Sequence, residues 1–143
     1  MTVSRLIDYS KFRSSLKRLE EQNANYRQGN PALSDLDREG IAESVIQRFE
    51  TCYDCLWKVL KRYLTEELGL AETPNSPRHI FRLANENALF DAPVEQWFRY
   101  VRARIDTSHD YDGEKANACL ALIPDFIDDA IALYRTVSGE PWE

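Results

Sequence analysis

Glycine and proline are scarce in this chain, with five glycines and six prolines among 143 residues. Folds built from short strands need frequent turns, and those turns draw on glycine and proline for their backbone angles. Their scarcity argues against a strand-and-turn architecture, and apolar residues recur at helical spacing from end to end. We therefore predict an all-α fold. A single domain over residues 1–143 is expected, because this length fits one domain and no linker divides the chain.

Long apolar runs and an excess of positive charge are also absent. No run approaches the roughly 20 residues that span a bilayer, and the N-terminal MTVSRLIDYSKF lacks the apolar segment of a signal peptide. We expect a cytoplasmic protein without membrane contact. The net charge is −6, from 18 Lys and Arg against 24 Asp and Glu. An acidic surface repels phosphate backbones, which argues against broad binding of duplex DNA but leaves room for a small basic pocket.

Cysteine is limited to Cys52, Cys55 and Cys119. The first two form a C-x-x-C, but a thioredoxin-like pair follows a strand and a closed zinc site needs four ligands. Because a helical pattern runs through both, we interpret them as small core residues. We expect no metal and no cofactor. Without a glycine-rich phosphate loop, the chain has no nucleotidyltransferase site of its own.

The first two predicted helices are the longest in the N-terminal half. One covers residues 10–28, and the next covers residues 36–68 after a cap at Ser34 or Asp35. Gly69 is the expected stop of the second helix, because glycine readily adopts the left-handed conformation that ends helices.

Three further helices complete the expected fold. A short third helix starts with Ser76 as cap and Pro77 in its first turn. The last opens at Asp112, ends near Gly139 and should kink at Pro124. The fourth carries an apolar stripe made of Val94, Trp97, Phe98, Val101 and Ile105.

Short connections between long amphipathic helices predict antiparallel neighbours. The expected architecture is an up-and-down four-helix bundle with one short accessory helix. The second helix is long for a compact monomer, so we expect part of its apolar stripe to form a homodimer interface. The residues concerned are Phe49, Tyr53, Trp57 and Leu60.

The stretch RIDTSHDY places Arg104, His109 and Tyr111 at the end of the fourth helix, in the spacing Arg-x4-His-x-Tyr. On an unbroken helix Arg104 and His109 lie about 140° apart. They converge only if the helix loosens near Thr107 or Ser108, whose side chains compete for backbone hydrogen bonds, or if a partner chain supplies one of them.

Two interpretations of this spacing remain open. Arg104 can grip phosphate oxygens in a fork, and His109 can transfer a proton near neutral pH, so together they suit phosphate binding or metal-independent RNA cleavage. Tyr111 offers a hydroxyl for modification or for a ligand. Alternatively, Arg104 and His109 simply complement the dipole at a helix C-terminus.

Three blocks together resemble the nucleotidyltransferase substrate-binding protein family, which belongs to the wider HEPN superfamily. They are IQRFETCYDCLWKVLKRYL, SPRHIFRLANENALF and WFRYVRARIDTSHDYDGEKA. The resemblance spans roughly residues 10–137. It implies a helical, homodimeric substrate-binding subunit that pairs with a separately encoded minimal nucleotidyltransferase in a two-gene, toxin–antitoxin-like module.

The resemblance also implies site residues and a second function. Arg104, His109 and Tyr111 would bind nucleotide or RNA, and Lys58 and Arg48 are further candidates, although a solvated lysine and an arginine that meets another helix are equally ordinary. The alternative is a HEPN ribonuclease toxin that uses Arg104 and His109 and is regulated by nucleotide addition at Tyr111. The family usually has a polar residue where this chain has Ile105, which weakens the ribonuclease interpretation.

Overall fold

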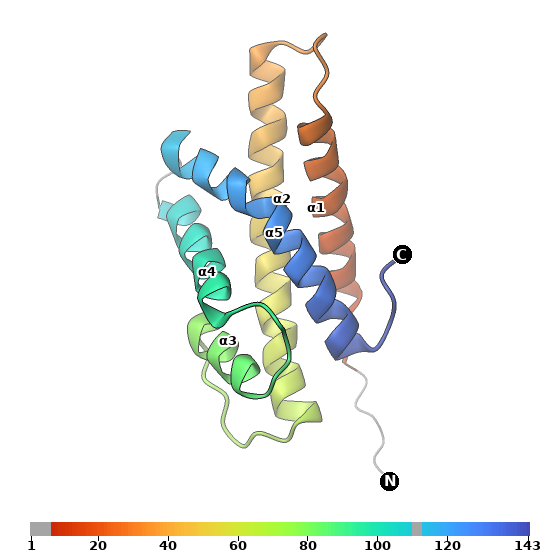
Figure 1. Cartoon of the computed structure of the whole chain (residues 1–143), viewed down its shortest axis with the longest axis vertical. Coiled ribbons are helices and arrows are strands. Elements are labelled where there is room, and N and C mark those ends of the chain that lie inside the picture. The colour runs from red at the N-terminus through yellow and green to blue at the C-terminus, as the bar shows by residue number, and fades with distance from the viewer. Residues whose placement is uncertain (1–6, 110–112) are drawn as a thin grey trace.

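The computed structural model describes residues 7–109 and 113–143, and every regular element in these ranges is helical. The all-α prediction is therefore confirmed. Five α-helices and one turn of π-helix follow one another along the chain (Figure 1). They are α1 (Ser10–Gln28), α2 (Asp35–Arg62), the π-helical η1 (Tyr63–Glu67), α3 (Pro77–Glu86), α4 (Val94–His109) and α5 (Gly113–Ser138).

The four long helices run up and down, as predicted, and α3 is the short accessory helix. α1 and α2 form an antiparallel hairpin, and α5 crosses it obliquely and contacts both (Figure 1). α4 packs against α5 and α2, and α3 packs against α2 and α4. The turn of the α1–α2 hairpin extends beyond the ends of α4 and α5.

Ser34 begins α2 as the cap predicted from the sequence. Its hydroxyl accepts a hydrogen bond from the Asp37 amide at 3.0 Å, and the Asp37 carboxylate accepts one from the Ser34 amide at 3.4 Å. This reciprocal pair is a capping box, which satisfies two amides that the helix leaves free. The helix is thus fixed at its exposed end by local interactions.

The end of α2 differs from the prediction. The α-helix stops at Arg62 rather than Leu68, and a π-turn follows in which the Leu68 amide bonds to the Tyr63 carbonyl at 3.2 Å. Periodicity did not reveal this change, because a π-turn adds one residue to the repeat without altering the residue types. Gly69 ends the helical run with a φ of 68°, as expected.

Ser76 and Pro77 lie at the start of α3, as predicted. Ser76 occupies the N-cap position and Pro77 begins the helix, but the Ser76 side chain makes no capping hydrogen bond. Pro124 lies inside α5, which continues through it, and the ribbon of α5 changes direction along its length (Figure 1). The expected cap at Asp112 falls outside the described residues.

An aromatic cluster fills the centre of the core. Trp97 packs edge-on against Tyr100 with ring centroids 5.2 Å apart, and Phe126 packs edge-on against Tyr100 at 5.1 Å and Phe49 at 4.9 Å. Such offset and edge-on arrangements suit the charge distribution of aromatic rings. Residues from α2, α4 and α5 thereby join in one core.

The cysteines behave as the sequence suggested, with one qualification. Cys52 and Cys119 are buried, while Cys55 is half-buried and packs against the core. All three are free thiols. Burial raises the pKa of Cys119 to about 12 and that of Cys52 further still, so both thiols stay protonated at neutral pH.

The apolar stripe of α2 is covered within a single chain. Phe49, Tyr53 and Leu60 are at most 2% exposed, and Trp57 is half-buried. Apart from Trp57, the expected surplus of apolar surface on this stripe is absent, because α1, α3, α4 and α5 all pack against α2. Among the described residues the exposed large apolar side chains are Leu36, Leu68 and Ile105, although Ile105 had been placed on the buried stripe of α4.

No helix within residues 7–109 or 113–143 has both the length and the apolar composition needed to cross a membrane.

Candidate functional site

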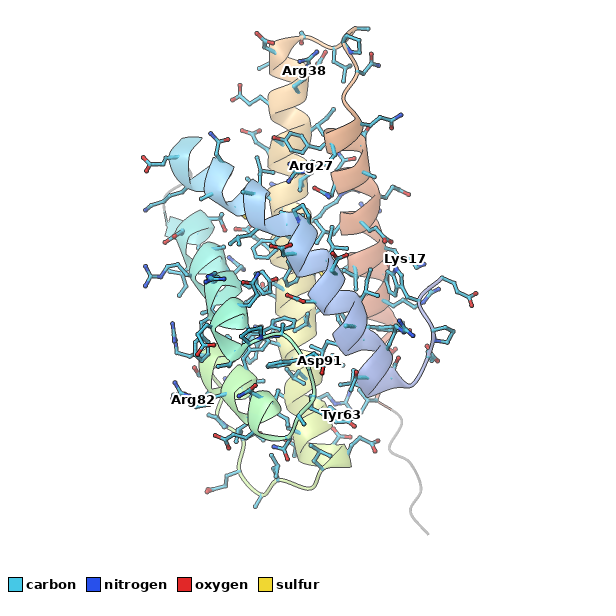
Figure 2. All side chains as sticks on the ribbon, viewed as in Figure 1. Lys17, Arg27, Arg38, Tyr63, Arg82 and Asp91 are labelled. Atoms are coloured by element: carbon cyan, nitrogen blue, oxygen red, sulfur yellow. The ribbon has the colours of Figure 1, made fainter. Side chains whose placement is uncertain are left out.

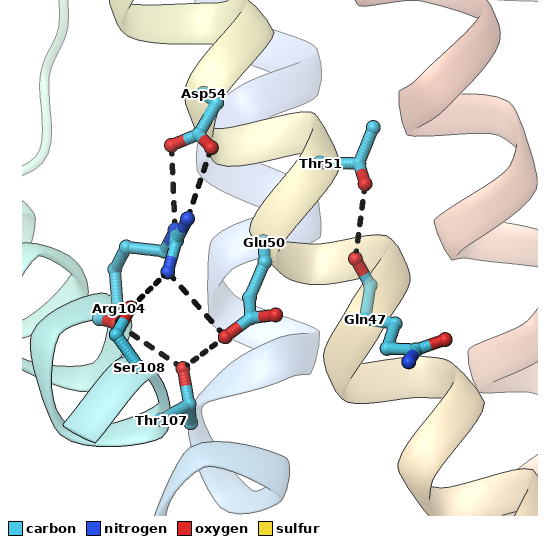
Figure 3. Close-up of polar contacts among 7 residues, drawn as sticks. All are labelled: Gln47, Glu50, Thr51, Asp54, Arg104, Thr107 and Ser108. Atoms are coloured by element: carbon cyan, nitrogen blue, oxygen red, sulfur yellow. Dashed lines mark hydrogen bonds and ion pairs between the residues drawn. The ribbon is translucent and has the colours of Figure 1, made fainter.

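Arg104 lies on the face of α4 that turns toward α2, and two carboxylates of α2 hold it there (Figure 3). Its Nε donates to Asp54 Oδ1 at 3.3 Å and its Nη2 donates to Asp54 Oδ2 at 3.0 Å. Its Nη1 lies 3.4 Å from Glu50 Oε2. The Asp54 contact is a two-pronged arginine–carboxylate pair, which fixes direction as well as distance.

Two hydroxyls complete this network. Thr107 Oγ1 donates to Glu50 Oε2 at 2.7 Å, and Ser108 Oγ accepts a bond from Arg104 Nη1. Thr107 and Ser108 also donate back to the Arg104 carbonyl, at 3.2 and 3.0 Å. We call Glu50, Asp54, Arg104, Thr107 and Ser108 the α2–α4 network (Figure 3).

Water reaches the α2–α4 network only in part. About a quarter of the Arg104 side chain is exposed, as is a similar share of Glu50, and Asp54 is 41% exposed. The hydrogen bond to Asp54 raises the pKa of Arg104 above its ordinary value, with further support from the charges of Asp54 and Glu50. Arg104 is therefore a permanent cation matched against two anions.

This arrangement changes what Arg104 can do. All three nitrogens of the guanidinium already donate to neighbouring side chains. A phosphate at this position would meet one arginine and two carboxylates, so it would have to displace Asp54 or Glu50 first. The geometry makes Arg104 a clamp between α2 and α4 as it stands.

The expected loosening of α4 does not occur. α4 continues as an α-helix through Thr107 and Ser108 to His109, because their hydroxyls bond to the Arg104 carbonyl while the backbone pattern persists. The loosening that a convergence of Arg104 and His109 within one chain would need is therefore absent from α4. The side chain of His109 and the whole of Tyr111 lie outside the described residues.

The other two candidates are not part of the α2–α4 network. Arg48 Nη1 donates to the Arg18 carbonyl of α1 at 2.9 Å, so it meets another helix, one of the two options that the sequence left open. Lys58 is exposed and lines a surface cavity of about 430 Å³ between the N-terminal end of α1 and α2. Asp54 lines the same cavity, which places Lys58 beside the network but not in it.

Sequence reasoning missed Glu50 and Asp54. They lie four residues apart, hence on one face of α2, and Arg104 and Thr107 are three apart on α4. Two acidic residues four apart on one helix, together with an arginine on another, could have suggested an ion pair between the two helices. The sequence alone did not tell which helix α4 would face.

Within the described parts of the chain, no group of three or more His, Cys, Asp or Glu residues is arranged to hold a metal ion. Asp128 and Asp129 are adjacent in sequence but do not form a metal site. Asp129 Oδ2 accepts a hydrogen bond from the Tyr100 hydroxyl at 2.5 Å.

Fold and network together define the class: a small all-α protein whose polar cluster lies at the contact of the second and fourth helices. The chain belongs to the family described as nucleotidyltransferase substrate binding protein like, whose model matches residues 7–138. This confirms the resemblance seen in the sequence.

Two solved structures and one curated protein are similar to the chain. HI0074 from Haemophilus influenzae, described as having the fold of a substrate binding domain of a nucleotidyltransferase, superposes with a TM-score of 0.80 at 25% identity, covering 92% of this chain and 99% of that one. Protein ttk003001694 from Thermus thermophilus gives a TM-score of 0.68 at 29% identity, covering 90% of this chain and 96% of that one.

The curated relative is a probable ribonuclease HepT from Haemophilus influenzae. It is 30% identical over 96 residues, which is 63% of this chain, and the match spans 62% of the relative's length.

Proposed function

We propose that this chain is the substrate-binding subunit of a separately encoded minimal nucleotidyltransferase, in a cytoplasmic two-gene, toxin–antitoxin-like module. The observation that carries the proposal is the family match over residues 7–138. The likeness to HI0074, which covers nearly all of both chains, supports it. The chain would act as one domain, and its acidic surface disfavours duplex DNA as a ligand.

In this proposal the end of α4 faces the substrate. Arg104 is held ready by Asp54 and Glu50, and His109 and Tyr111 follow it in the chain. A substrate that displaces one carboxylate would gain a cation already pointed in a fixed direction, which lowers the ordering cost of binding. Lys58, beside Asp54, is a second contact for a phosphate group.

Arg48, a candidate for substrate binding in the sequence, instead has a structural role in this proposal. Its hydrogen bond from Nη1 to the Arg18 carbonyl ties α2 to α1. We therefore assign Arg48 to the hairpin rather than to the substrate.

The test of the leading proposal is complex formation with purified components. Isothermal titration of this chain into the minimal nucleotidyltransferase encoded beside it should give saturable binding with a defined stoichiometry. An unrelated helical protein of similar charge serves as the control. Absence of binding at concentrations up to about 100 μM would refute the pairing.

A second candidate is a ribonuclease that needs no metal, and the likeness to the probable ribonuclease HepT favours it. The ribose 2′-oxygen would attack phosphorus and give up its proton to His109. The bond from phosphorus to the 5′-oxygen would break, that oxygen would take up a proton from the protonated His109 or from water, and Arg104 would stabilise the extra negative charge of the transition state. Nucleotide addition to the Tyr111 hydroxyl would then regulate the enzyme.

Two features rank this candidate second. Glu50 and Asp54 neutralise the cation that the transition state needs, and Ile105 stands where the family usually has a polar residue. The test is RNA cleavage in excess chelator. Robust cleavage that falls about 100-fold or more in His109→Ala, while RNA binding survives, would make the ribonuclease the correct assignment.

A further inference from the structure

α4 presents a second polar face, opposite in character to the α2–α4 network. Phe98, Arg99 and Arg102 of α4 line a surface groove of about 400 Å³, together with Lys115 and Leu122 of α5. Arg78 of α3 lies at its edge and also lines it. We call this the α4–α5 groove. Its size is that of a small-molecule site, which typically measures about 300–1,000 Å³.

The floor of the α4–α5 groove is apolar and aromatic. Phe98 is half-buried, and Leu122 and the buried Cys119 adjoin it. The Arg78 guanidinium lies over the Phe98 ring, 4.3 Å from its centroid, and the guanidinium of Arg82 lies 5.8 Å from the same centroid. Arg82 projects from α3 on the side of the molecule where α3 meets α4 (Figure 2). Arginine stacked on an aromatic ring is a platform on which nucleobases stack.

The rim of the groove is positively charged, although the whole chain carries −6. Among the described residues that line the groove, four are cations (Arg78, Arg99, Arg102 and Lys115) and two are carboxylates (Glu95 and Asp106), a formal sum of +2.

Arg99 and Arg102 have fewer charged partners than Arg104. Arg99 donates to the Gln96 amide oxygen at 2.5 Å, a neutral partner. Arg102 is exposed and has no hydrogen-bond or ion-pair partner among the residues that the structure describes. Arg104 is held by two carboxylates, whereas Arg102, two residues before it, is available to an anion.

We propose that the α4–α5 groove binds the nucleotide, with the phosphates on Arg99 and Arg102 and the base on the Arg78–Phe98 stack. This inference rests on the proposed function and gives the nucleotide a site of its own, separate from the substrate contacts proposed at Arg104 and Lys58. Both parts of a nucleotide find their complement here: the forked guanidinium groups suit phosphate oxygens, and the platform suits a flat ring. At the α2–α4 network the same phosphates would meet Glu50 and Asp54.

The test measures nucleotide binding by this chain alone, without the nucleotidyltransferase. ATP, GTP, CTP and UTP are titrated separately by calorimetry at low salt, with inorganic triphosphate as a parallel ligand. At least one nucleotide should bind, and more weakly as salt is added. Arg102→Gln should weaken that binding by at least about tenfold, because a charge-assisted contact is lost.

Phe98→Leu separates the base from the phosphates. It should weaken nucleotide binding several-fold and leave inorganic triphosphate unchanged, because only the base uses the platform. Arg135→Gln is the matched control: Arg135 is also an exposed arginine, near the C-terminal end of α5 and away from the groove, so its loss should leave binding at the wild-type level.

Three outcomes would overturn the proposal. One is no binding of any of the four nucleotides at millimolar concentration. Another is loss of binding in Arg104→Gln with Arg102→Gln at wild-type affinity, which would assign the anion to the α2–α4 network. The third is loss of nucleotidyltransferase binding in Arg102→Gln without loss of nucleotide binding, which would make the groove a protein-docking surface. This assay does not include the nucleotidyltransferase. A negative result would therefore refute the nucleotide site, while binding of this chain to the nucleotidyltransferase is tested separately by the titration described above.

Discussion

Arg104 shows how one residue can be found by sequence and still change its role in the structure. The spacing to His109 and Tyr111 marked it as a phosphate ligand, but Asp54 and Glu50 hold its guanidinium between α2 and α4. Arg104 thus connects α4 to α2, through carboxylates that lie 50 and 54 residues before it in the sequence.

Removing one charge from the α2–α4 network should loosen the end of α4. Asp54→Asn keeps the shape of the side chain but weakens the pair with Arg104, and we expect the free energy of unfolding to fall by roughly 0.5–1.5 kcal/mol, since the pair is partly exposed. Amide hydrogen exchange of residues 104–108 should speed up. Asp91→Asn, an exposed carboxylate without a hydrogen bond or ion pair to other described residues, is the control. Equal exchange in both variants would argue against a clamp.

Asp129 provides a pH-dependent test. Burial raises its pKa above the ordinary value, even though the hydrogen bond from Tyr100 acts in the opposite direction. A raised pKa in the folded state means that stability is fully present below the unfolded pKa and is lost as pH rises through the folded one. Asp129→Asn should therefore be more stable than wild type at pH 7, and the gap should narrow as the pH falls below about 4. Urea unfolding at the two pH values measures this, and a gap that widens in acid would contradict it.

At the scale of elements, helix bounds followed from the sequence except at the end of α2: α1 ends at Gln28 and α5 at Ser138, as predicted. Ser34 and Pro77 mark starts through side-chain and ring chemistry that acts locally, so both were readable. The π-turn after Arg62 was not, because it depends on how the end of α2 meets its neighbours. Ile105 was misplaced for the same reason, since periodicity assigns a face but does not say whether another helix covers it.

The α2 cap gives a matched pair of variants. Ser34→Ala removes the hydroxyl that accepts from the Asp37 amide and should lower the free energy of unfolding by about 1 kcal/mol. Ser76→Ala should have little effect, because the Ser76 side chain makes no cap hydrogen bond. Chemical denaturation of both variants checks the difference. A larger loss in Ser76→Ala than in Ser34→Ala would overturn the assignment of the two helix starts.

At the scale of the whole molecule, helical periodicity predicted part of the core. It placed Trp97 and Phe49 on apolar stripes, and both are buried, whereas Tyr100 and Phe126, which complete the aromatic cluster, were not predicted. Glu50, Asp54 and the α4–α5 groove depend on which helices become neighbours, and that is a property of the folded chain. The sequence therefore singled out Arg104 on α4 but did not reveal the carboxylates of α2 that contact it.

Dimerisation is the whole-molecule prediction that the structure revises. Most of the α2 stripe is covered, with Trp57 half-buried, and Ile105 is the exposed large apolar residue of the described chain nearest to the α2–α4 network in sequence, so we propose that a homodimer would use the surface around Ile105. We expect sedimentation at micromolar concentration to give about twice the monomer mass of 16.6 kDa. Ile105→Asp should shift the mass toward the monomer, and Leu36→Asp, on the projecting hairpin, should leave it unchanged. A wild-type protein that sediments as a monomer would contradict the predicted homodimer.

The most direct measurement of the central claim is nucleotide transfer by the minimal nucleotidyltransferase proposed as its partner, as this chain is added. With a labelled nucleoside triphosphate, the transfer rate should rise with the concentration of this chain and level off at the stoichiometry of the complex, with the label on a third molecule. Label that accumulates on this chain and disappears in Tyr111→Phe would instead support the regulated ribonuclease. A transfer rate that is the same with and without this chain would contradict its role as a substrate-binding subunit.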